Sequence, residues 1–499
     1  MEKNAFTEYR KYWKELVNLQ NVISILHWDS EVTMPPEARP ERAGQIAQLS
    51  ALQHKNFTGN HFLRLIDEAE EFIRRTKPEK ESFYLREIEV LRKERNRAVT
   101  LPVELVEKFS QKTNLAHGIW ESARKNKNFK EFEGILSEIV ELSIEMAECY
   151  GYDRNRYDAL LEGYETGINV EKLDPLFMGL KNSLIPMVNE AREFPNPFKS
   201  EISERRQELF NRRLPAALGL PEDMSRLDKS SHPFSTNLGR KDFRITTRYD
   251  EKDPISSIMG VLHESGHSLY EMGVGEMEDY PSPLTASVSF GIHESQSRLW
   301  ENQIGRSRAF WEYYYPSLCK DFEINHYDLP FEDLYNYLNS SAKTKIRVEA
   351  DQLTYNLHII LRYEIEKELI SEGLPVRELP ERWNAGMKEL FDLQIHNDAE
   401  GVLQDVHWSG GGFGYFPTYT LGNIYSAQFF HKFLEDTPDF WKGLMQHGDL
   451  SPLSNWLKKN IHLQGKILEP DKLIEKVCGA RPKPEYLVKY LKTRLKEFF

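Results

Sequence analysis

Most of the chain distributes its apolar residues with the period of an α-helix. Leu, Ile, Phe and Trp recur at three- and four-residue spacing through residues 5–150, over 170–193 and in the stretch that ends at Phe499. This period gathers the apolar side chains on one face of each helix, where they can pack on a common core. No internal repeat and no linker rich in Gly, Ser or Pro divides the chain. We therefore expect a mainly α-helical protein with two lobes, formed by residues 1–499 as a single domain.

A strand pattern replaces the helical one between Ser231 and Tyr249. Phe243, Ile245 and Thr247 alternate with polar residues, which is the two-residue period of a strand with one exposed face. We expect a small antiparallel β-sheet here, close to the histidine pair that comes next in the sequence. The edge of such a sheet can pair with the backbone of a bound peptide, although a simple connecting hairpin fits the pattern equally well.

The histidine pair lies in His263-Glu264-Ser265-Gly266-His267, within a helix predicted to begin near Asp253-Pro254. Two histidines four residues apart project from one face of a helix, so both imidazoles can reach one metal ion. Glu264 can then lie beside the ion and accept a proton from its water. The motif predicts His263 and His267 as metal ligands and Glu264 as general base. The alternative is a pair of surface histidines that binds nothing.

A catalytic zinc site needs a third protein ligand, and a carboxylate commonly supplies it. The next predicted helix, residues 287–304, carries Glu294 and Glu301, which are seven residues apart and therefore lie on nearly the same face. Spacing alone does not choose between them, although the pattern favours Glu294. In many two-helix zinc sites an aspartate four residues after the ligand glutamate orients the first histidine. Arg298 occupies that position here, so this partner must come from elsewhere.

Composition restricts the possible partners of such a site. The net charge of -13 disfavours nucleic acids and anionic membranes and leaves peptides and small molecules as candidates. The three cysteines form no C-x-x-C pair, which suits a reducing compartment. We see no signal peptide at the amino terminus and no apolar run near the ~20 residues that span a bilayer. We therefore expect a soluble cytoplasmic protein.

A glycine-rich segment is the other candidate for catalytic chemistry. Four glycines occur within residues 409–414, after His407 and before Tyr415 and Tyr419. His and Tyr are neutral hydrogen-bond donors that can stabilise the oxyanion formed when water attacks a peptide carbonyl. The structural alternative is a helix–loop–helix corner with packed aromatic residues. Upstream, Arg347 lies in a segment, residues 345–351, that is predicted to open a long helix; by itself it fits a surface charge or an ion pair.

Taken in order, these residues resemble the carboxypeptidase Taq family, over essentially the whole chain. The resemblance is carried by His232-Pro233-Phe234, Asp242 to Thr246, His263 to His267, His293 to Arg298, Ile346 to Asp351, and Gln404 to Trp408 leading into Gly414 to Tyr419. It implies His263, His267 and Glu294 as ligands and Glu264 as base, and so selects Glu294 over Glu301. It also implies a mostly helical fold with a deep central groove, similar to thimet oligopeptidase and angiotensin-converting enzyme, and a homodimer. By the same analogy His407, Tyr415 and Tyr419 surround the reacting carbonyl.

The expected function is therefore that of a zinc-dependent carboxypeptidase that removes single amino acids from peptide C-termini. Cobalt or manganese can replace zinc in such sites. Arg347 is our first candidate for binding the terminal carboxylate and Arg244 the second, with His232 as a further substrate contact. An oligoendopeptidase or dipeptidyl carboxypeptidase on the same scaffold is the main alternative, and a non-catalytic helical binding protein is the other.

Overall fold

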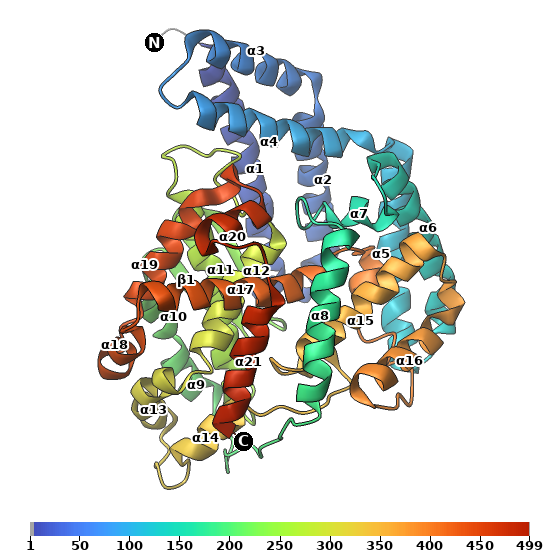
Figure 1. The fold of residues 1–499 in the computed structure, drawn as a ribbon. Coiled ribbons are helices and arrows are strands. Elements are labelled where there is room, and N and C mark those ends of the chain that lie inside the picture. Colours follow the sequence, from blue (N-terminus) through green and yellow to red (C-terminus); the bar gives the residue numbers. More distant parts are fainter. Residues whose placement is uncertain (1–3, 499) are drawn as a thin grey trace.

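The computed structural model describes residues 4–498, and most of them belong to helices (Figure 1). The first four long helices form an amino-terminal layer: α1 (Ala5–Val32), α2 (Arg39–Thr58), α3 (Asn60–Thr76) and α4 (Glu81–Thr100). Helices α3 and α4 lie across the top in Figure 1, and α1 and α2 run downward from there. This layer has a small core of its own, in which Tyr9 and Leu16 of α1 pack on Phe62 and Ile66 of α3. Helix α1 ends just before Met34-Pro35-Pro36, because proline cannot continue it.

A second, much larger core joins the rest of the chain, from Ala116 to Leu491. Its helices before the sheet are α5 (Val103–Asn126), α6 (Lys130–Tyr150), α7 (Arg156–Leu161), α8 (Val170–Val188), α9 (Glu204–Asn211) and α10 (Leu214–Leu218). After the sheet come α11 (Pro254–Gly275), α12 (Phe290–Arg298), α13 (Arg308–Phe322), α14 (Phe331–Leu338), α15 (Tyr355–Lys367), α16 (Leu379–Phe391), α17 (Pro417–Asp436), α18 (Phe440–His447), α19 (Ser451–Asn460), α20 (Pro470–Cys478) and α21 (Pro484–Phe498). The mainly helical fold expected from the sequence is confirmed.

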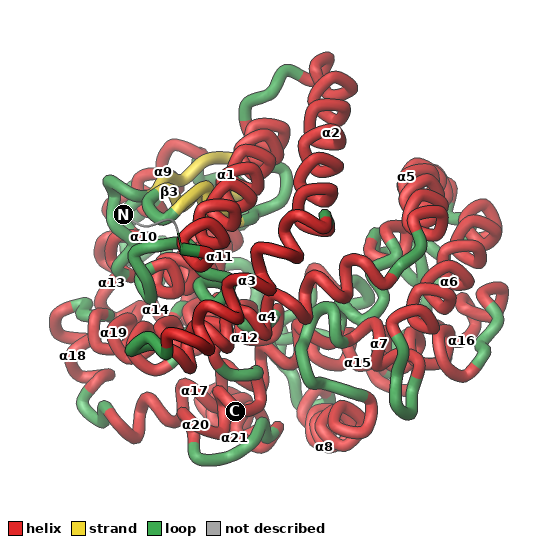
Figure 2. The backbone as a smooth tube through the Cα atoms, turned by 90° about the horizontal axis from the view of Figure 1, so that it is seen from above, coloured by secondary structure: helices red, strands yellow, loops and turns green. Residues whose placement is uncertain are grey.

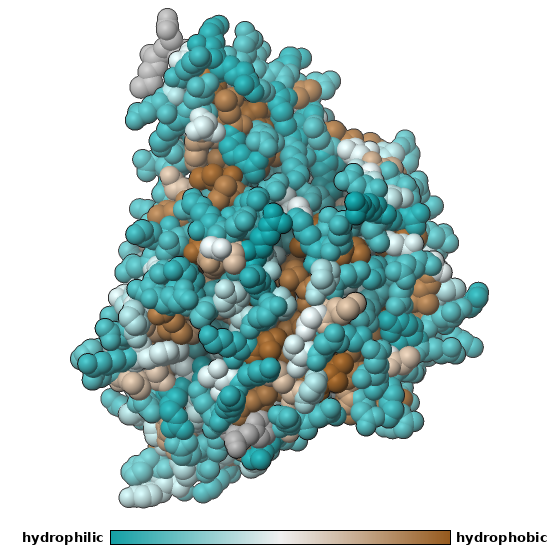
Figure 3. Space-filling view, viewed as in Figure 1, coloured by the Kyte–Doolittle hydropathy of each residue, from teal (hydrophilic) through white to brown (hydrophobic). Residues whose placement is uncertain are grey.

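Short 3-10 and π segments connect or extend these helices: η1 (Pro36–Ala38), η2 (Leu299–Ile304), η3 (Arg347–Glu349), η4 (Glu368–Glu372), η5 (Val376–Glu378), η6 (His407–Gly410) and η7 (His462–Ile467). Seen from above, α2 and α5 stand apart from each other (Figure 2). Within residues 4–498, no helix combines the length and the apolar character that a membrane span requires. The face drawn in Figure 3 is mostly hydrophilic, with scattered apolar patches.

The small sheet consists of β1 (Ser225–Lys229), β2 (Ser235–Gly239) and β3 (Asp242–Thr247), in the order β1-β3-β2. Strand β2 pairs with β3 antiparallel, but β1 pairs with β3 in parallel. The sheet is thus mixed and not antiparallel as expected. The turn after β1 leads to β2 at the opposite edge of the sheet. The turn after Gly239 then places β3 between β1 and β2. Because β3 is central and packs on α11, Thr246 is buried as well as Ile245, where alternation predicted an exposed residue.

Candidate metal centre

Helix α11 carries His263, Glu264 and His267 and is buried on most of its circumference. It lies so close to α12 that a Cβ on Gly266 would come within 2.7 Å of the Gln296 carbonyl oxygen. On the opposite side of α12, a Cβ on Gly422 of α17 would come within 2.5 Å of the Glu294 side chain. These two glycines allow the backbones to approach closely enough for Glu294 to reach both histidines.

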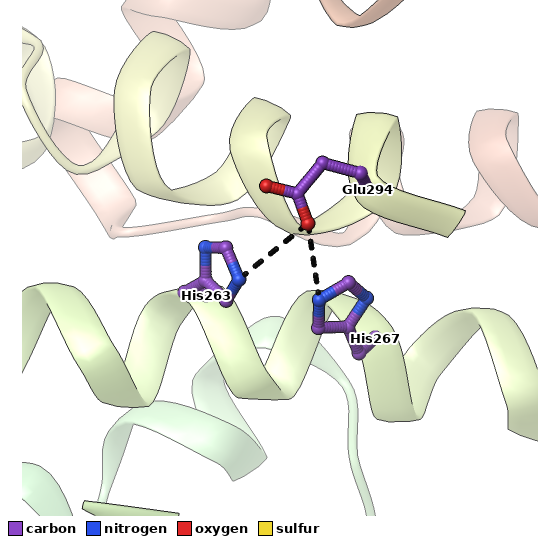
Figure 4. Close-up of side chains that lie close together, drawn as sticks. All are labelled: His263, His267 and Glu294. Carbon is purple, nitrogen blue, oxygen red and sulfur yellow. Dashed lines mark ion pairs between the residues drawn. The ribbon is translucent and has the colours of Figure 1, made fainter. Parts of the chain in front are cut away.

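The three side chains point at a common centre (Figure 4). Glu294 Oε2 lies 3.8 Å from His263 Nε2 and 3.5 Å from His267 Nε2, and the ligand atoms of the three residues lie within 4.8 Å of one another. An ion with tetrahedral bonds of about 2.0–2.1 Å separates its ligand atoms by about 3.3–3.4 Å. Two imidazole nitrogens and one carboxylate oxygen at these separations fit such an ion, with one position left for water or substrate.

Glu301 takes the role that an aspartate four residues after the ligand glutamate has in many two-helix zinc sites. Its Oε2 accepts a hydrogen bond from His263 Nδ1 at 2.8 Å, so it orients the histidine. Arg298 lies between the two glutamates, 2.7 Å from Glu294 Oε1 and 3.1 Å from Glu301 Oε2. Burial by itself would raise the pKa of both carboxyls, but Arg298 holds the pKa of Glu294 well below its usual range and lowers that of Glu301 to about 2. The seven-residue spacing was the sequence signal for this partner.

His267 is supported through another histidine, which sequence reasoning did not single out. Its Nδ1 is hydrogen-bonded to Nδ1 of His293, whose Nε2 lies 2.9 Å from Glu271 Oε1. Asn237 of β2 in turn donates to Glu271 Oε2 at 3.0 Å. This relay connects the sheet to the second metal histidine. The available signals were that Glu271 lies four residues after His267 and that His293 immediately precedes Glu294.

Glu264 lies among the ligands without belonging to the set of converging atoms. Its side chain is buried, and burial raises the pKa of this carboxyl to about 7, with the neighbouring Glu294 adding to the rise and His263 opposing it. A carboxylate with a pKa near neutrality can both accept and return a proton. We call α11, α12 and η2 the metal half of the site.

The glycine-rich segment and the start of α17 form a second group, which we call the loop half. His407 lies in η6, with its ring centroid 5.6 Å from that of Tyr415, and Tyr415 lies 5.2 Å from Tyr419. Burial lowers the pKa of His407 to about 4 and raises the pKa of both tyrosines. All three groups are therefore neutral at working pH. His407 Nδ1 is buried and has no hydrogen-bond partner within residues 4–498.

The buried carboxylate of Glu366 holds the loop half in place through hydrogen bonds. Glu366 of α15 accepts hydrogen bonds from Trp408 Nε1 at 2.8 Å and from the Gly414 backbone N–H at 2.8 Å. The hydroxyl of Tyr157 donates to the same oxygen as Gly414. Burial raises the pKa of Glu366 to about 7. Gly414 has a φ of 93° and lies against the backbone of α7, so this corner requires glycine.

Arg347 is buried beside the loop half and engages Asp405. Its Nε and Nη2 both lie 2.8 Å from Asp405 Oδ1, and its Nη1 donates to the Tyr355 hydroxyl at 3.0 Å. The fully buried Arg362 donates to the other oxygen of Asp405. Two guanidinium groups thus share one carboxylate. The expected long helix does not open here, because Asp351 caps the backbone near Thr354 and α15 begins only at Tyr355.

Arg244 lies on the sheet, and His232 lies in a turn beside it. Arg244 of β3 pairs with Asp242 at 2.9 Å, and its guanidinium lies 4.3 Å from the centroid of the Trp28 ring of α1. His232 is exposed in the turn between β1 and β2. Of the predicted substrate contacts, the structure therefore brings Arg347 and Tyr419 together, with a guanidinium-to-ring distance of 5.5 Å, and Arg244 keeps a separate partner.

Comparison with known proteins places these features in a family. Residues 8–495 match the model of the carboxypeptidase Taq (M32) metallopeptidase family. The chain is 36% identical to Carboxypeptidase 1 of Bacillus subtilis and 37% identical to Thermostable carboxypeptidase 1 of Pyrococcus furiosus, each over 99% of this chain and 98% of the relative. The solved structure of an M32 carboxypeptidase from Deinococcus radiodurans superposes with a TM-score of 0.94 at 32% identity, over 99% of both chains. That of Pyrococcus furiosus carboxypeptidase gives 0.93 at 34% identity, also over 99% of both.

Proposed function

Since the chain belongs to the carboxypeptidase Taq (M32) metallopeptidase family and is a metallocarboxypeptidase, we propose that it releases single amino acids from peptide C-termini with a zinc ion held by His263, His267 and Glu294. The observation that carries the ligand assignment is the convergence of two imidazole nitrogens and one carboxylate oxygen at 3.5 and 3.8 Å. Cobalt or manganese is also compatible with this donor set.

Glu264 is the general base in this proposal. When bound, the ion supplies Lewis acidity, which lowers the pKa of water and polarises a carbonyl group. Glu264 accepts the proton of the attacking water and then delivers it to the leaving amine. Its pKa of about 7, raised by burial, supports both steps, because a carboxyl with this pKa exchanges a proton readily at neutral pH.

His407, Tyr415 and Tyr419 are proposed to donate hydrogen bonds to the oxygen that becomes negatively charged. Their neutral forms support this role, since a donor must keep its proton to stabilise an oxyanion. The unpartnered Nδ1 of His407 adds support, because a buried polar atom without a partner is costly unless a ligand completes it.

Arg347 is proposed to bind the terminal carboxylate of the substrate. Arg347, Arg362 and Asp405 together leave one positive charge without a counter-charge in a buried cluster. Burying an unpaired charge is costly, so this cluster favours an incoming carboxylate, and internal peptide bonds carry none. Arg244 remains the second candidate and His232 a further substrate contact. Arg244 is fully paired with Asp242, which makes it the weaker anchor.

We also propose a cytoplasmic homodimer. The three free cysteines support a reducing compartment, and the dimer rests on the family resemblance. Light scattering of the purified protein tests the oligomeric state.

The decisive experiment measures kcat/KM on one peptide and on its C-terminal amide, with products identified by mass. We expect wild type to release only the last residue and to prefer the free acid strongly. Arg347→Ala should cost about ten- to a hundred-fold on the acid and lose most of this preference, because a charge-assisted pair contributes roughly 1.5–3 kcal/mol.

Arg244→Ala is the matched control, since it removes a guanidinium that already has a partner and should keep the preference. Dipeptide or internal products from wild type would instead indicate a dipeptidyl carboxypeptidase or oligoendopeptidase. If Arg347→Ala keeps the full preference for the free acid and Arg244→Ala loses it, then Arg244 binds the terminal carboxylate and Arg347 does not.

A further inference from the structure

An aromatic cluster borders the site at the amino-terminal end of α12. The rings of Phe290, Tyr164 and Tyr415 contact one another nearly edge to face, with centroid distances of 5.6, 5.4 and 5.7 Å. Phe290 is 50% exposed although it is large and apolar. We infer that Phe290 and Tyr164 form a subsite for the side chain of the peptide residue on the amino side of the scissile bond. This inference rests on the proposed function.

The order of side chains along α12 indicates the direction in which the bound peptide runs. Phe290, Glu294 and Arg298 are four residues apart, so they share one face and are separated by about 6 Å per step. The Arg298 guanidinium lies 4.8 Å from the Tyr355 ring centroid, and the Tyr355 hydroxyl accepts from Arg347. The proposed carboxylate anchor is therefore at the Arg298 end, the metal ligand is in the middle, and Phe290 is at the other end.

A peptide whose terminal carboxylate is bound at Arg347 places its last peptide bond near Glu294. The residue before that bond then lies toward Phe290. Tyr415 connects the two regions, because it contacts both Phe290 and the proposed oxyanion donor Tyr419. The backbone N–H of Phe290 also donates to the Tyr164 carbonyl at 3.0 Å, so the two walls of the subsite are held in fixed relation.

The chemistry of the surrounding cavity selects an apolar or aromatic side chain. Phe290 and Tyr164 line a cavity of about 560 Å³ beneath α4, which can hold a large side chain. Six of its eight charged lining residues form ion pairs, in Lys93–Glu162 at 2.6 Å, Lys466–Glu94 at 2.6 Å and Arg86–Glu89 at 2.7 Å. The other two, Arg97 and Glu469, have opposite charges, and Arg97 donates to the Ala159 carbonyl. The cavity thus offers no unbalanced charge to a ligand, whereas an exposed phenylalanine gains free energy when another apolar group covers it.

The experiment compares two N-acetylated tripeptides that end in the same leucine and carry either phenylalanine or alanine at the next-to-last position. We expect wild type to favour the phenylalanine peptide at least about tenfold in kcat/KM, which is the usual discrimination of an apolar pocket. Phe290→Ala should lose most of this ratio, with less than about threefold change on the alanine peptide and unchanged metal content. Phe290→Leu should restore part of the ratio, because leucine keeps an apolar wall.

Tyr327→Ala is the matched control, since Tyr327 is 78% exposed in the segment between α13 and α14 and lines none of these walls. It should leave the ratio unchanged. No preference in wild type, or an equal loss on both peptides in Phe290→Ala, overturns the subsite. A Phe290→Ala effect that depends on the C-terminal residue instead overturns the direction. Release of leucine alone in all these cases would leave the proposed function intact, whereas dipeptide or internal products would contradict that function itself.

Discussion

Glu294 in the metal half and Glu366 beneath the loop half are both buried, yet their pKa values move in opposite directions. Burial raises both, but Glu294 also lies 2.7 Å from the guanidinium of Arg298, which holds its pKa far below the usual range. Glu366 is paired with neutral donors from Trp408, Tyr157 and Gly414, and its pKa rises to about 7.

The difference reflects what each half must do. A metal ligand has to be ionised, so the metal half contains arginine close to its carboxylates. An oxyanion donor has to keep its proton, so the loop half is built from neutral, buried groups. Substitutions of the metal ligands should consequently lower both metal content and turnover, whereas substitutions in the loop half should lower turnover with metal retained.

The largest effect should come from Glu264, which lies in the metal half but, like Glu366, has a raised pKa. Glu264→Gln should lower kcat about 10²–10⁴-fold, because the ligands remain and the proton acceptor is lost. Metal content should stay at the wild-type level. A chelator should abolish wild-type activity, and zinc or cobalt should restore it. Loss of metal from Glu264→Gln would instead show that Glu264 is a metal ligand, and the proposed separation between ligands and general base would fail.

The next effect tests the loop half. His407→Ala and Tyr415→Phe should each lower kcat about 10²–10³-fold, since each removes one oxyanion donor, and metal content should not change. Turnover and metal analysis on the same preparations provide the check. Near-normal turnover in both variants would reduce the segment to a structural corner.

A smaller effect should come from the groups that orient the metal histidines. Glu301→Gln replaces the charged acceptor of His263 with a neutral amide, and His293→Gln interrupts the relay to His267. Each should weaken metal binding about 10–100-fold, as outer partners of metal ligands typically do. Titration against a competing chelator measures this without an activity assay. Glu312→Gln, in the exposed part of α13, is the control and should leave affinity unchanged. Unaltered affinity in Glu301→Gln would mean that the hydrogen bond to His263 has no share in holding the ion.

The smallest effect concerns pH and stability. The native pKa of Glu366 is about 7 against an ordinary value of 4.5, so the folded state binds this proton more tightly than the unfolded chain. The resulting stabilisation is complete below pH 4.5 and is lost as pH rises through 7, a change of up to roughly 3 kcal/mol. Glu366→Gln cannot titrate. Its melting temperature should therefore fall less between pH 5 and pH 8 than that of wild type.

Glu165 contributes a similar pH dependence to the melting temperature. Burial raises its pKa to about 7 as well, and it accepts from the Gly291 backbone at the start of α12. It is present in wild type and in Glu366→Gln, so its contribution cancels in the difference between them. Parallel pH dependence of the two melting temperatures would show that Glu366 does not titrate in this range.

The sequence was most informative where one element determines the outcome. Helical period predicted the fold, and four-residue spacing predicted that His263 and His267 share a face. It was less informative where several elements meet. Alternation along β3 does not state which strands flank it, so the mixed sheet was missed. Glu366 is one of several glutamates in a helix and gives no sign that it lies beneath the glycine-rich loop. Glu301 was considered only as a rival ligand, because its contact with His263 depends on how two helices pack.

Glu301 owes its position to the π turn of η2, in which the Gly305 N–H donates to the Trp300 carbonyl five residues earlier. A π turn accommodates one residue more than an α-helical turn. Deleting Trp300 would let the segment relax to α-helix and rotate Glu301 by about 100° relative to Glu294, while the chain after the turn keeps its orientation. In this stretch the chain length is itself under constraint. Insertions and deletions should be tolerated far less than substitutions, even at positions whose side chains touch nothing in the site.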